Sequence, residues 1–232
     1  MGTRPILLAA EGVAKGTVLG LDEAGRGSLI GPLVVGGFLT TERRAGELAE
    51  LGVRDSKLLS PARRSEIYSR LPAVGTRCSV VLPPRRIDRY VRRGKLNVLE
   101  AEAFATLVRR HRPTRTIADA CDVNARRFAS RVSAHSGTDL RVEARHRADR
   151  TELVVGAASI VAKVERDLAI AQLAERLGSA IGSGYPSDDR TTAFVRSVLE
   201  RGPAPDYVRT SWATMGRIMA RPEAPALEAF GR

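Results

Sequence analysis

The sequence predicts a mixed α/β fold, in which one β-sheet carries helices packed on it. Two observations predict this class: short apolar runs typical of strands come first, and they then alternate with longer segments of helical periodicity. A third observation concerns the C-terminal part, which has no good strand. We therefore expect a sheet domain over residues 1–178 and a helical C-terminal appendage over residues 179–232.

Five segments are predicted to be strands because they are short, apolar and bounded by turn residues. The glycine- and proline-rich segment 25–32 is predicted to be the turn that joins the first two. In chain order the predicted strands are Thr17–Leu21, Leu33–Leu39, Cys78–Leu82, Arg115–Ala120 and Leu140–Arg145.

Six segments are predicted to be helices. The first runs to Leu71 and begins at Ser60 and Pro61, a good N-cap followed by a proline in the first helical position. The others show apolar residues at three- and four-residue spacing. They are 97–111, 124–134, 151–177, 189–201 and 211–220, with a Gly-, Ser- and Pro-rich loop over 178–188 and a frayed tail over 221–232.

The composition favours a basic, globular protein that binds phosphate groups. The net charge is +12, and because only four of the 38 basic residues are lysines, 34 are arginines. Arginine binds phosphate bidentately, and a strongly basic chain is attracted to nucleic acid over a long range. Coding bias also enriches arginine, so charge alone leaves nucleic-acid binding open.

Several function classes are disfavoured. No apolar run approaches the roughly 20 residues of a membrane span, so we expect no membrane association. The N-terminal apolar run is short and is interrupted by Glu11, so we expect no signal peptide and a cytoplasmic protein. The two cysteines, Cys78 and Cys121, form no CxxC pair, which disfavours a structural zinc site.

Carboxylates stand at the ends of predicted elements in three separate segments. Asp22 and Glu23 follow the first strand, Asp119 ends the fourth, and Asp149 precedes the long helix. Successive strand side chains point to opposite faces, so Asp22 and Glu23 can share a site only if the strand ends or distorts there. The simpler alternative is that these acids cap helices or lie in solvated turns.

Converging acids would have a clear chemical use in a basic protein. Hard divalent cations such as Mg²⁺ prefer oxygen ligands, and a pair of them can activate water and stabilise the leaving oxygen in phosphodiester hydrolysis. The basic surface would attract the phosphate backbone, and the acids would hold the metal ions.

Six ordered sequence blocks resemble type 2 ribonucleases H (ribonuclease HII), and two of them, DVNARRF and GSGYPSD, resemble the archaeal branch. Ser28 departs from the family, in which many members have proline after GRG, and we expect a less rigid turn there. The blocks extend from about Val18 to Ala220 and are GLDEAGRGSLIGPLVVG, DSKLLS, LNVLEAEAFA, ADACDVNARRF, ASIVAKVERD and GSGYPSD.

The resemblance implies a ribonuclease H-like catalytic domain over 1–178 and a substrate-binding appendage over 179–232. It implies an endonuclease that cuts the RNA strand of RNA/DNA hybrids and ribonucleotides embedded in duplex DNA, leaving a 3′-hydroxyl and a 5′-phosphate. Two divalent ions, Mg²⁺ or Mn²⁺, would bind four carboxylates that are also the catalytic residues: Asp22, Glu23, Asp119 and Asp149. Asp122 would be structural, and the protein would be a monomer.

The resemblance also implies substrate contacts. The backbone of the GRG turn would read the 2′-hydroxyl of the ribonucleotide, the group that distinguishes RNA from DNA. A loop tyrosine would contact the RNA–DNA junction, and two lysines would bind phosphates. The residues are Gly25, Arg26, Gly27, Tyr185, Lys57 and Lys163.

Two other functions stay open at this point. A DNA-directed nuclease of the same broad fold would cut an all-DNA duplex as fast as a hybrid. A non-catalytic, basic RNA-binding protein would need no acidic cluster and would tolerate Asp22→Asn. The presence of all four acids disfavours the second alternative.

Overall fold

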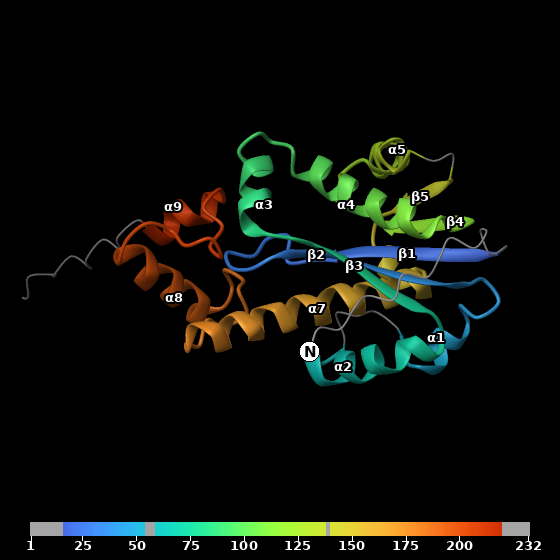
Figure 1. Ribbon diagram of the computed structural model, residues 1–232, viewed down its shortest axis with the longest axis horizontal. Helices are drawn as coiled ribbons and strands as arrows, with labels where there is room; N and C mark the ends of the chain where they lie inside the picture. The colour runs from blue at the N-terminus through green and yellow to red at the C-terminus, as the bar shows by residue number, and fades with distance from the viewer. Residues whose placement is uncertain (1–15, 54–58, 138–139, 220–232) are drawn as a thin grey trace, which may run out of the picture. The chain divides into compact units, whose positions relative to one another are not determined.

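The computed structural model describes residues 16–53, 59–137 and 140–219 (Figure 1). These residues form two compact units, each made of segments distant in the sequence. Of the described residues, the first unit comprises 16–24, 35–53, 59–80, 100–137 and 140–164, and the second comprises 25–34, 81–99 and 165–219. Each unit is described by itself below.

A five-stranded sheet in the order β3-β2-β1-β4-β5 organises the first unit. Its strands are β1 (Thr17–Ala24), β2 (Leu33–Thr41), β3 (Thr76–Leu82), β4 (Arg115–Asp119) and β5 (Val142–Arg145). β4 pairs in parallel with both β1 and β5, and Leu21 lies opposite Ala118. The residues that follow this pair, Asp22 of β1 and Asp119 of β4, therefore lie on neighbouring strands close to one another.

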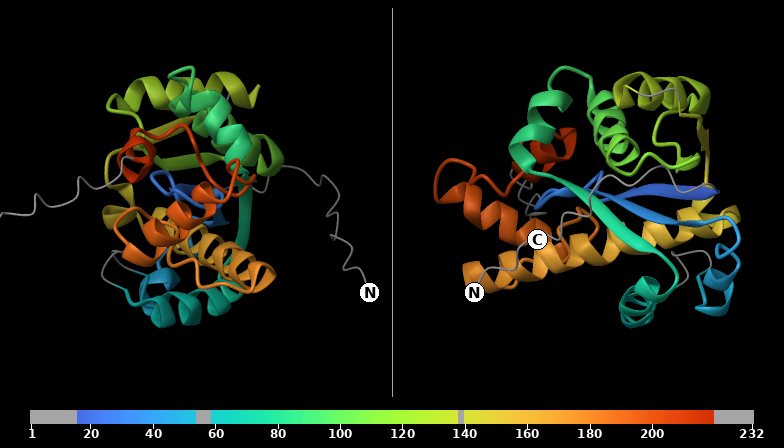
Figure 2. Two further views of the ribbon diagram at one scale, coloured as in Figure 1. Left: turned by 90° about the vertical axis from the view of Figure 1, so that its left-hand side faces the viewer. Right: turned by 45° about the vertical axis from the view of Figure 1, so that its right-hand side comes forward.

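Helices cover both faces of this sheet (Figures 1 and 2). On one face lie α4 (Leu96–His111) and α5 (Ala125–Ser136), which meet in an edge-to-face contact of Phe104 and Phe128 with ring centroids 5.2 Å apart. On the other face lie the first half of α7 (Leu153–Leu177) and two shorter helices. These are α1 (Glu47–Glu50) and α2 (Pro61–Arg70), the latter followed by a 3-10 turn, Leu71–Ala73.

A glycine lets the start of α7 lie directly against β1. A Cβ on Gly20 would stand 2.1 Å from the carbonyl oxygen of Val154, well inside contact distance. Only glycine fits where two backbones approach this closely. The close packing fixes α7, which carries Ser159 and Lys163, beside the strand that carries Asp22.

The second unit has an apolar core of its own, centred on Leu29, Ile30, Ile170, Leu173 and Val195. Ile30 forms an antiparallel bridge with Val208. Its helices are α3 (Pro84–Val91), α8 (Asp189–Glu200), α9 (Ala213–Met219) and the second half of α7. Among the described residues of the chain, no helix is long and apolar enough to cross a membrane.

The predicted mixed sheet flanked by helices is confirmed, and each predicted strand and helix has a counterpart. Three helices were not predicted: α1, α3 and the single turn α6 (Ala148–Thr151), which carries Asp149. α3 begins at Pro84, in the favourable first position, and buries Ile87 three residues later, so a local helical signal was present in the sequence. The division at residue 178 stays a prediction, since the second unit also includes residues 25–34 and 81–99.

Candidate functional site

Three of the four predicted carboxylates come together in the first unit. One oxygen from each of Asp22, Asp119 and Asp149 lies within 4.8 Å of the other two. Asp22 stands on β1, Asp119 ends the neighbouring β4, and Asp149 lies on α6, where the N–H of Ala148 donates to Asp119 Oδ1 at 3.4 Å. Strand pairing and one turn of helix thus assemble the group from segments up to 127 residues apart in sequence.

Burial destabilises negative charge within this group of aspartates. Asp22 is 6% exposed and Asp149 is 3% exposed. Desolvation raises the pKa of Asp22 to about 6; Lys163 and a hydrogen bond from Ser159 oppose the rise, and the charge of Asp119 adds to it. Crowded, desolvated carboxylates are stabilised when a cation joins them.

Glu23 belongs to a second group. It shares a 4.8 Å cluster with Glu100 of α4 and Cys121, which follows β4. β1 does not end at the acids but continues to Ala24, and neighbouring side chains on a strand point to opposite faces. The structure thus gathers Glu23 with partners other than those of Asp22, and a shared metal site for the two acids stays a prediction.

Asp122 has structural partners. Its side chain is fully buried and forms ion pairs with Arg127 at 2.5 Å and Arg131 at 3.3 Å. It also accepts from the N–H of Asn124 at 3.0 Å, at the start of α5. These contacts anchor α5. They also explain why Asp122, although only three residues from Asp119, does not join the group formed by Asp22, Asp119 and Asp149.

The GRG turn lies in the second unit and is held by hydrogen bonds from distant segments. Gly25 has a φ of +86°, and its N–H donates to the Tyr185 hydroxyl at 3.0 Å. The Ser28 hydroxyl donates to the Gly25 carbonyl at 2.9 Å, so the residue that departs from the family pattern closes the turn with a bond that proline cannot make.

Arg26 and Gly27 differ in their surroundings. The Arg26 guanidinium donates to Asn97 Oδ1 at 2.6 Å, and the Arg26 carbonyl accepts from the buried Arg209 at 3.1 Å. Gly27 is exposed, and a Cβ there would meet nothing within 4 Å. The turn is therefore fixed at Gly25 and Arg26 and open at Gly27.

Tyr185 is positioned by a guanidinium. The Arg166 guanidinium lies 4.1 Å from the Tyr185 ring centroid, and its Nη2 donates to the Ser183 carbonyl at 2.8 Å. Arg166 is 2% exposed. Its charge is therefore satisfied by the tyrosine face, a backbone oxygen and the Asp167 carboxylate, which lies 3.4 Å from Nη1.

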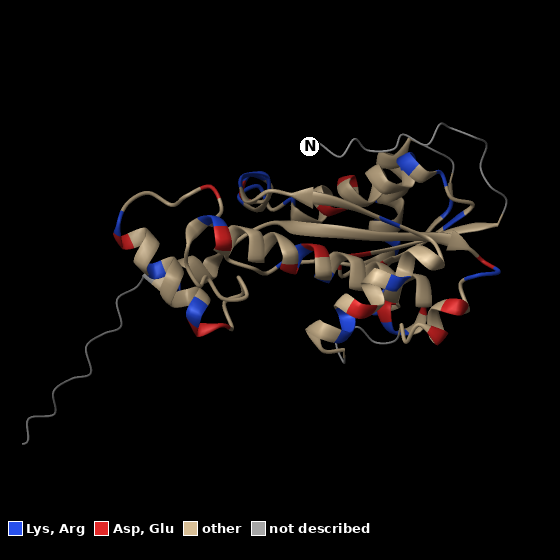
Figure 3. Ribbon diagram, turned by 60° about the horizontal axis from the view of Figure 1, so that its bottom comes forward, with Lys and Arg blue, Asp and Glu red and all other residues tan. Residues whose placement is uncertain are grey.

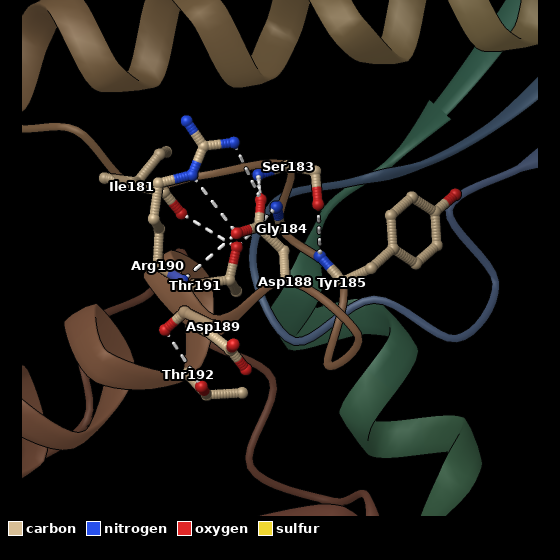
Figure 4. A network of polar contacts seen from close by, with 9 residues as sticks. All are labelled: Ile181, Ser183, Gly184, Tyr185, Asp188, Asp189, Arg190, Thr191 and Thr192. Atoms are coloured by element: carbon tan, nitrogen blue, oxygen red, sulfur yellow. Dashed lines mark hydrogen bonds and ion pairs between the residues drawn. The ribbon is translucent and has the colours of Figure 1, made fainter.

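The loop that carries Tyr185 is tied down by Asp188. This carboxylate accepts from the N–H groups of Ser183 at 2.7 Å and Arg190 at 3.1 Å, and these bonds hold its pKa well below the ordinary value (Figure 4). Thr191 adds bonds to Gly184 and Ile181. In Figure 4 the ring of Tyr185 points away from this network. The network therefore fixes the backbone of the loop and does not contact the ring.

The two predicted lysines have different outcomes. Lys57 lies outside the described residues. Lys163 is half-buried on α7, where its Nζ donates to Ser159 Oγ at 2.5 Å and its charge lowers the pKa of Asp22. Lys163 thus stands beside the aspartates in the first unit.

Several polar residues of the site were missed in the sequence. A charge at helical spacing from core residues was an available signal: Glu100 lies four residues before Phe104, and Arg166 lies four before Ile170. Asn97 gave no local signal, because its partner Arg26 lies 71 residues away.

Comparison with known proteins gives a consistent family. The family model described as Ribonuclease HII matches residues 19–215. A ribonuclease HII of Methanothrix thermoacetophila is 42% identical over 205 residues, covering 88% of this chain and 97% of that protein.

Solved structures agree. The ribonuclease H2 of Pyrococcus horikoshii has a TM-score of 0.79 and 39% identity, covering 87% of this chain and 96% of that one. The ribonuclease HII of Archaeoglobus fulgidus, solved in a complex with PCNA, has a TM-score of 0.80 and 35% identity, covering 89% and 98%.

Proposed function

This chain belongs to the ribonuclease HII family of metal-dependent endonucleases, which degrade the RNA of RNA/DNA hybrids, and from that premise we propose that its aspartate group holds the divalent ions. The resemblance noted in the sequence, including that to the archaeal branch, is confirmed. The observation that carries the proposal is the approach of oxygens from Asp22, Asp119 and Asp149 to within 4.8 Å of one another.

The donor set fits a hard cation. All three groups offer carboxylate oxygen, two of them are almost completely buried, and burial destabilises the charged form of Asp22. Divalent ions, Mg²⁺ or Mn²⁺ and two per site in this proposal, supply activation of a water and stabilisation of the leaving 3′-oxygen. Glu23, next to Asp22 in the family motif, is the fourth proposed ligand.

Other residues orient rather than react. Ser159 and Lys163 hold Asp22 in place and favour its ionised form. The backbone of Gly25–Arg26–Gly27 is proposed to read the 2′-hydroxyl, because glycine allows close approach. Hydrogen bonds that the turn donates to Tyr185 and accepts from Ser28 and Arg209 preorganise it.

We extend the proposal to the substrate contacts and to the oligomeric state. Tyr185, held by Arg166, would contact the sugar at the junction of RNA and DNA. Residues 179–232 would act as the substrate-binding appendage, of which 220–232 lie outside the described residues. We further propose that the protein acts as a cytoplasmic monomer.

Metal binding is expected to weaken below pH 6. The metal-free pKa of Asp22 is about 6, above its ordinary 3.8, so between these values the folded protein binds more protons than the unfolded chain. Without metal, the contribution of Asp22 to stability therefore falls as pH rises through this window. A cation must displace the proton, so its apparent affinity should drop about tenfold per pH unit below 6 and level off above.

Titration calorimetry with Mn²⁺ from pH 5 to 8 would bear this out if binding releases about one proton at pH 5, about half a proton near pH 6 and almost none at pH 8. The Asp22→Asn variant is the control and should show weak binding with no such proton release. A wild-type affinity that stays flat across pH 6 would exclude Asp22 as the titrating ligand.

The experiment that tests the function compares three labelled duplexes: an RNA/DNA hybrid, a DNA duplex with one ribonucleotide, and an all-DNA duplex. We expect metal-dependent cleavage of the first two, at the phosphate 5′ of a ribonucleotide, and 3′-hydroxyl and 5′-phosphate ends. Equal cleavage of the all-DNA duplex would indicate a DNA-directed nuclease, and tight binding without cleavage would indicate a non-catalytic RNA-binding protein.

A further inference from the structure

The segment formed by α3 and the turn after it is the most basic short stretch in the second unit. Figure 3 shows blue concentrated on this short helix. One acid, Asp88, interrupts the stretch and is buried, whereas every basic side chain is exposed. The basic residues, six within eleven positions, are Arg85, Arg86, Arg89, Arg92, Arg93 and Lys95.

Asp88 is committed to internal bonds. Its Oδ2 accepts from the N–H and the hydroxyl of Thr210, both at 2.9 Å. Its Oδ1 accepts from the N–H of Ser211 at 3.2 Å and from the hydroxyl at 2.5 Å. Arg92 lies 3.9 Å from Asp88 and donates to Thr210, so Asp88 offsets at most this one charge.

The arginines line an open cleft. It has a volume of about 480 Å³ between α3 and the loop 204–210. Four guanidinium-bearing residues face it, with Asp206 as the acid on the loop side: Arg85, Arg89, Arg92 and Arg93. Positions 85, 89 and 92 follow helical spacing, so these side chains share one face along about 10 Å of axis, the length of roughly three nucleotides of one strand.

Hydrogen bonds tie this cleft to the GRG turn within the second unit. Arg209, which precedes Thr210, is fully buried and donates to the carbonyls of Gly31 at 3.0 Å and Arg26 at 3.1 Å. Asn97, two residues beyond Lys95, accepts from Arg26. A strand whose ribose meets the turn would therefore meet the arginine face in a fixed register.

We propose that the arginine cleft binds the sugar–phosphate backbone of the duplex that flanks the ribonucleotide, an inference that rests on the proposed function. Arginine forks match phosphate oxygens in pairs, and a row of them suits a repeating polyanion better than a single small anion. The cleft adds affinity for long duplexes without touching the reacting groups. It lies outside every residue assigned above to metal or ribose.

The test removes three of these charges in the full-length protein by R85Q/R89Q/R93Q, leaving Arg92 and its bond to Thr210 intact. The matched control, R110Q/R126Q/R176Q, removes three exposed arginines from α4, α5 and α7. Thermal melts establish that both variants fold. The probes are a long and a short duplex, each with one ribonucleotide.

Affinity for the long duplex, measured in EDTA, is expected to fall about tenfold in the α3 variant and less than twofold in the control. The slope of log affinity against log salt should decrease by about 0.9 for each phosphate that the variant no longer neutralises. In cleavage assays KM for the long duplex should rise in proportion while kcat is unchanged, and the short duplex should show no difference from wild type.

Long-duplex affinity equal to that of the control variant would overturn the inference, as would an equal loss on the short duplex. Failure of the proposed function gives a different result: the wild type would bind the long duplex in EDTA but cleave neither substrate. The binding measurement still decides the role of the cleft in that case.

Discussion

Replacing Asp119 by asparagine should reduce cleavage of an RNA/DNA hybrid by a factor on the order of 10³ or more, because a charged metal ligand becomes neutral. Asparagine keeps the size of the side chain and one oxygen that can accept from the N–H of Ala148, so the fold should persist. Single-turnover cleavage at saturating Mn²⁺, with a thermal melt of the metal-free protein, separates an effect on chemistry from an effect on stability.

Asp122→Asn is the matched control, since it makes the same change three residues along the same block. Asp122 is buried against Arg127 and Arg131, so its loss should cost about 1–3 kcal/mol of stability. Below its melting temperature this variant should cleave at nearly the wild-type rate. The assignment fails if Asp119→Asn stays active or if Asp122→Asn is equally inactive while folded.

Gly25→Ala should have the second largest effect, by distorting the turn that is proposed to read the ribose. Gly25 has a φ of +86°, and an added Cβ would stand 2.7 Å from the Pro32 carbonyl oxygen and 2.8 Å from Arg166 Nε. Strain and overlap together are expected to cost about 1–3 kcal/mol and to displace the N–H that donates to Tyr185. We expect kcat/KM on a duplex with one ribonucleotide to fall by about 10²-fold.

Gly27→Ala provides the control in the same turn. Its added Cβ would meet nothing within 4 Å, so a loss of less than about tenfold is expected, arising only from the nearer approach of a methyl group to substrate. Comparable losses in the two variants would show that the bond from Gly25 to Tyr185 is not what organises the turn.

The sheet and the aspartates were predictable because their signals are local. Apolar runs precede Asp22 and Asp119, and the parallel pairing of β1 with β4 places the two acids on neighbouring strands. The surroundings of Glu23 were less predictable, because a strand that continues to Ala24 turns alternate side chains to opposite faces. How far a strand continues beyond its apolar run depends on the strands that pair with it, and the local sequence does not contain that information.

The hydrogen bonds that hold the GRG turn were not predictable from the local sequence pattern. The bond from Gly25 to Tyr185 joins residues 160 positions apart, and that from Arg209 to Arg26 joins residues 183 positions apart. Arginine is abundant in this chain, so the sequence does not distinguish the buried, structural Arg166 and Arg209 from the exposed arginines of α3. Only their burial in the structure distinguishes them.

The most direct test of the metal centre is anomalous diffraction from crystals grown with Mn²⁺. We expect an anomalous peak within coordination distance of Asp22, Asp119 and Asp149. A Mn²⁺ ion bound in the active protein only at Glu23, Glu100 and Cys121, with none among the three aspartates, would contradict it.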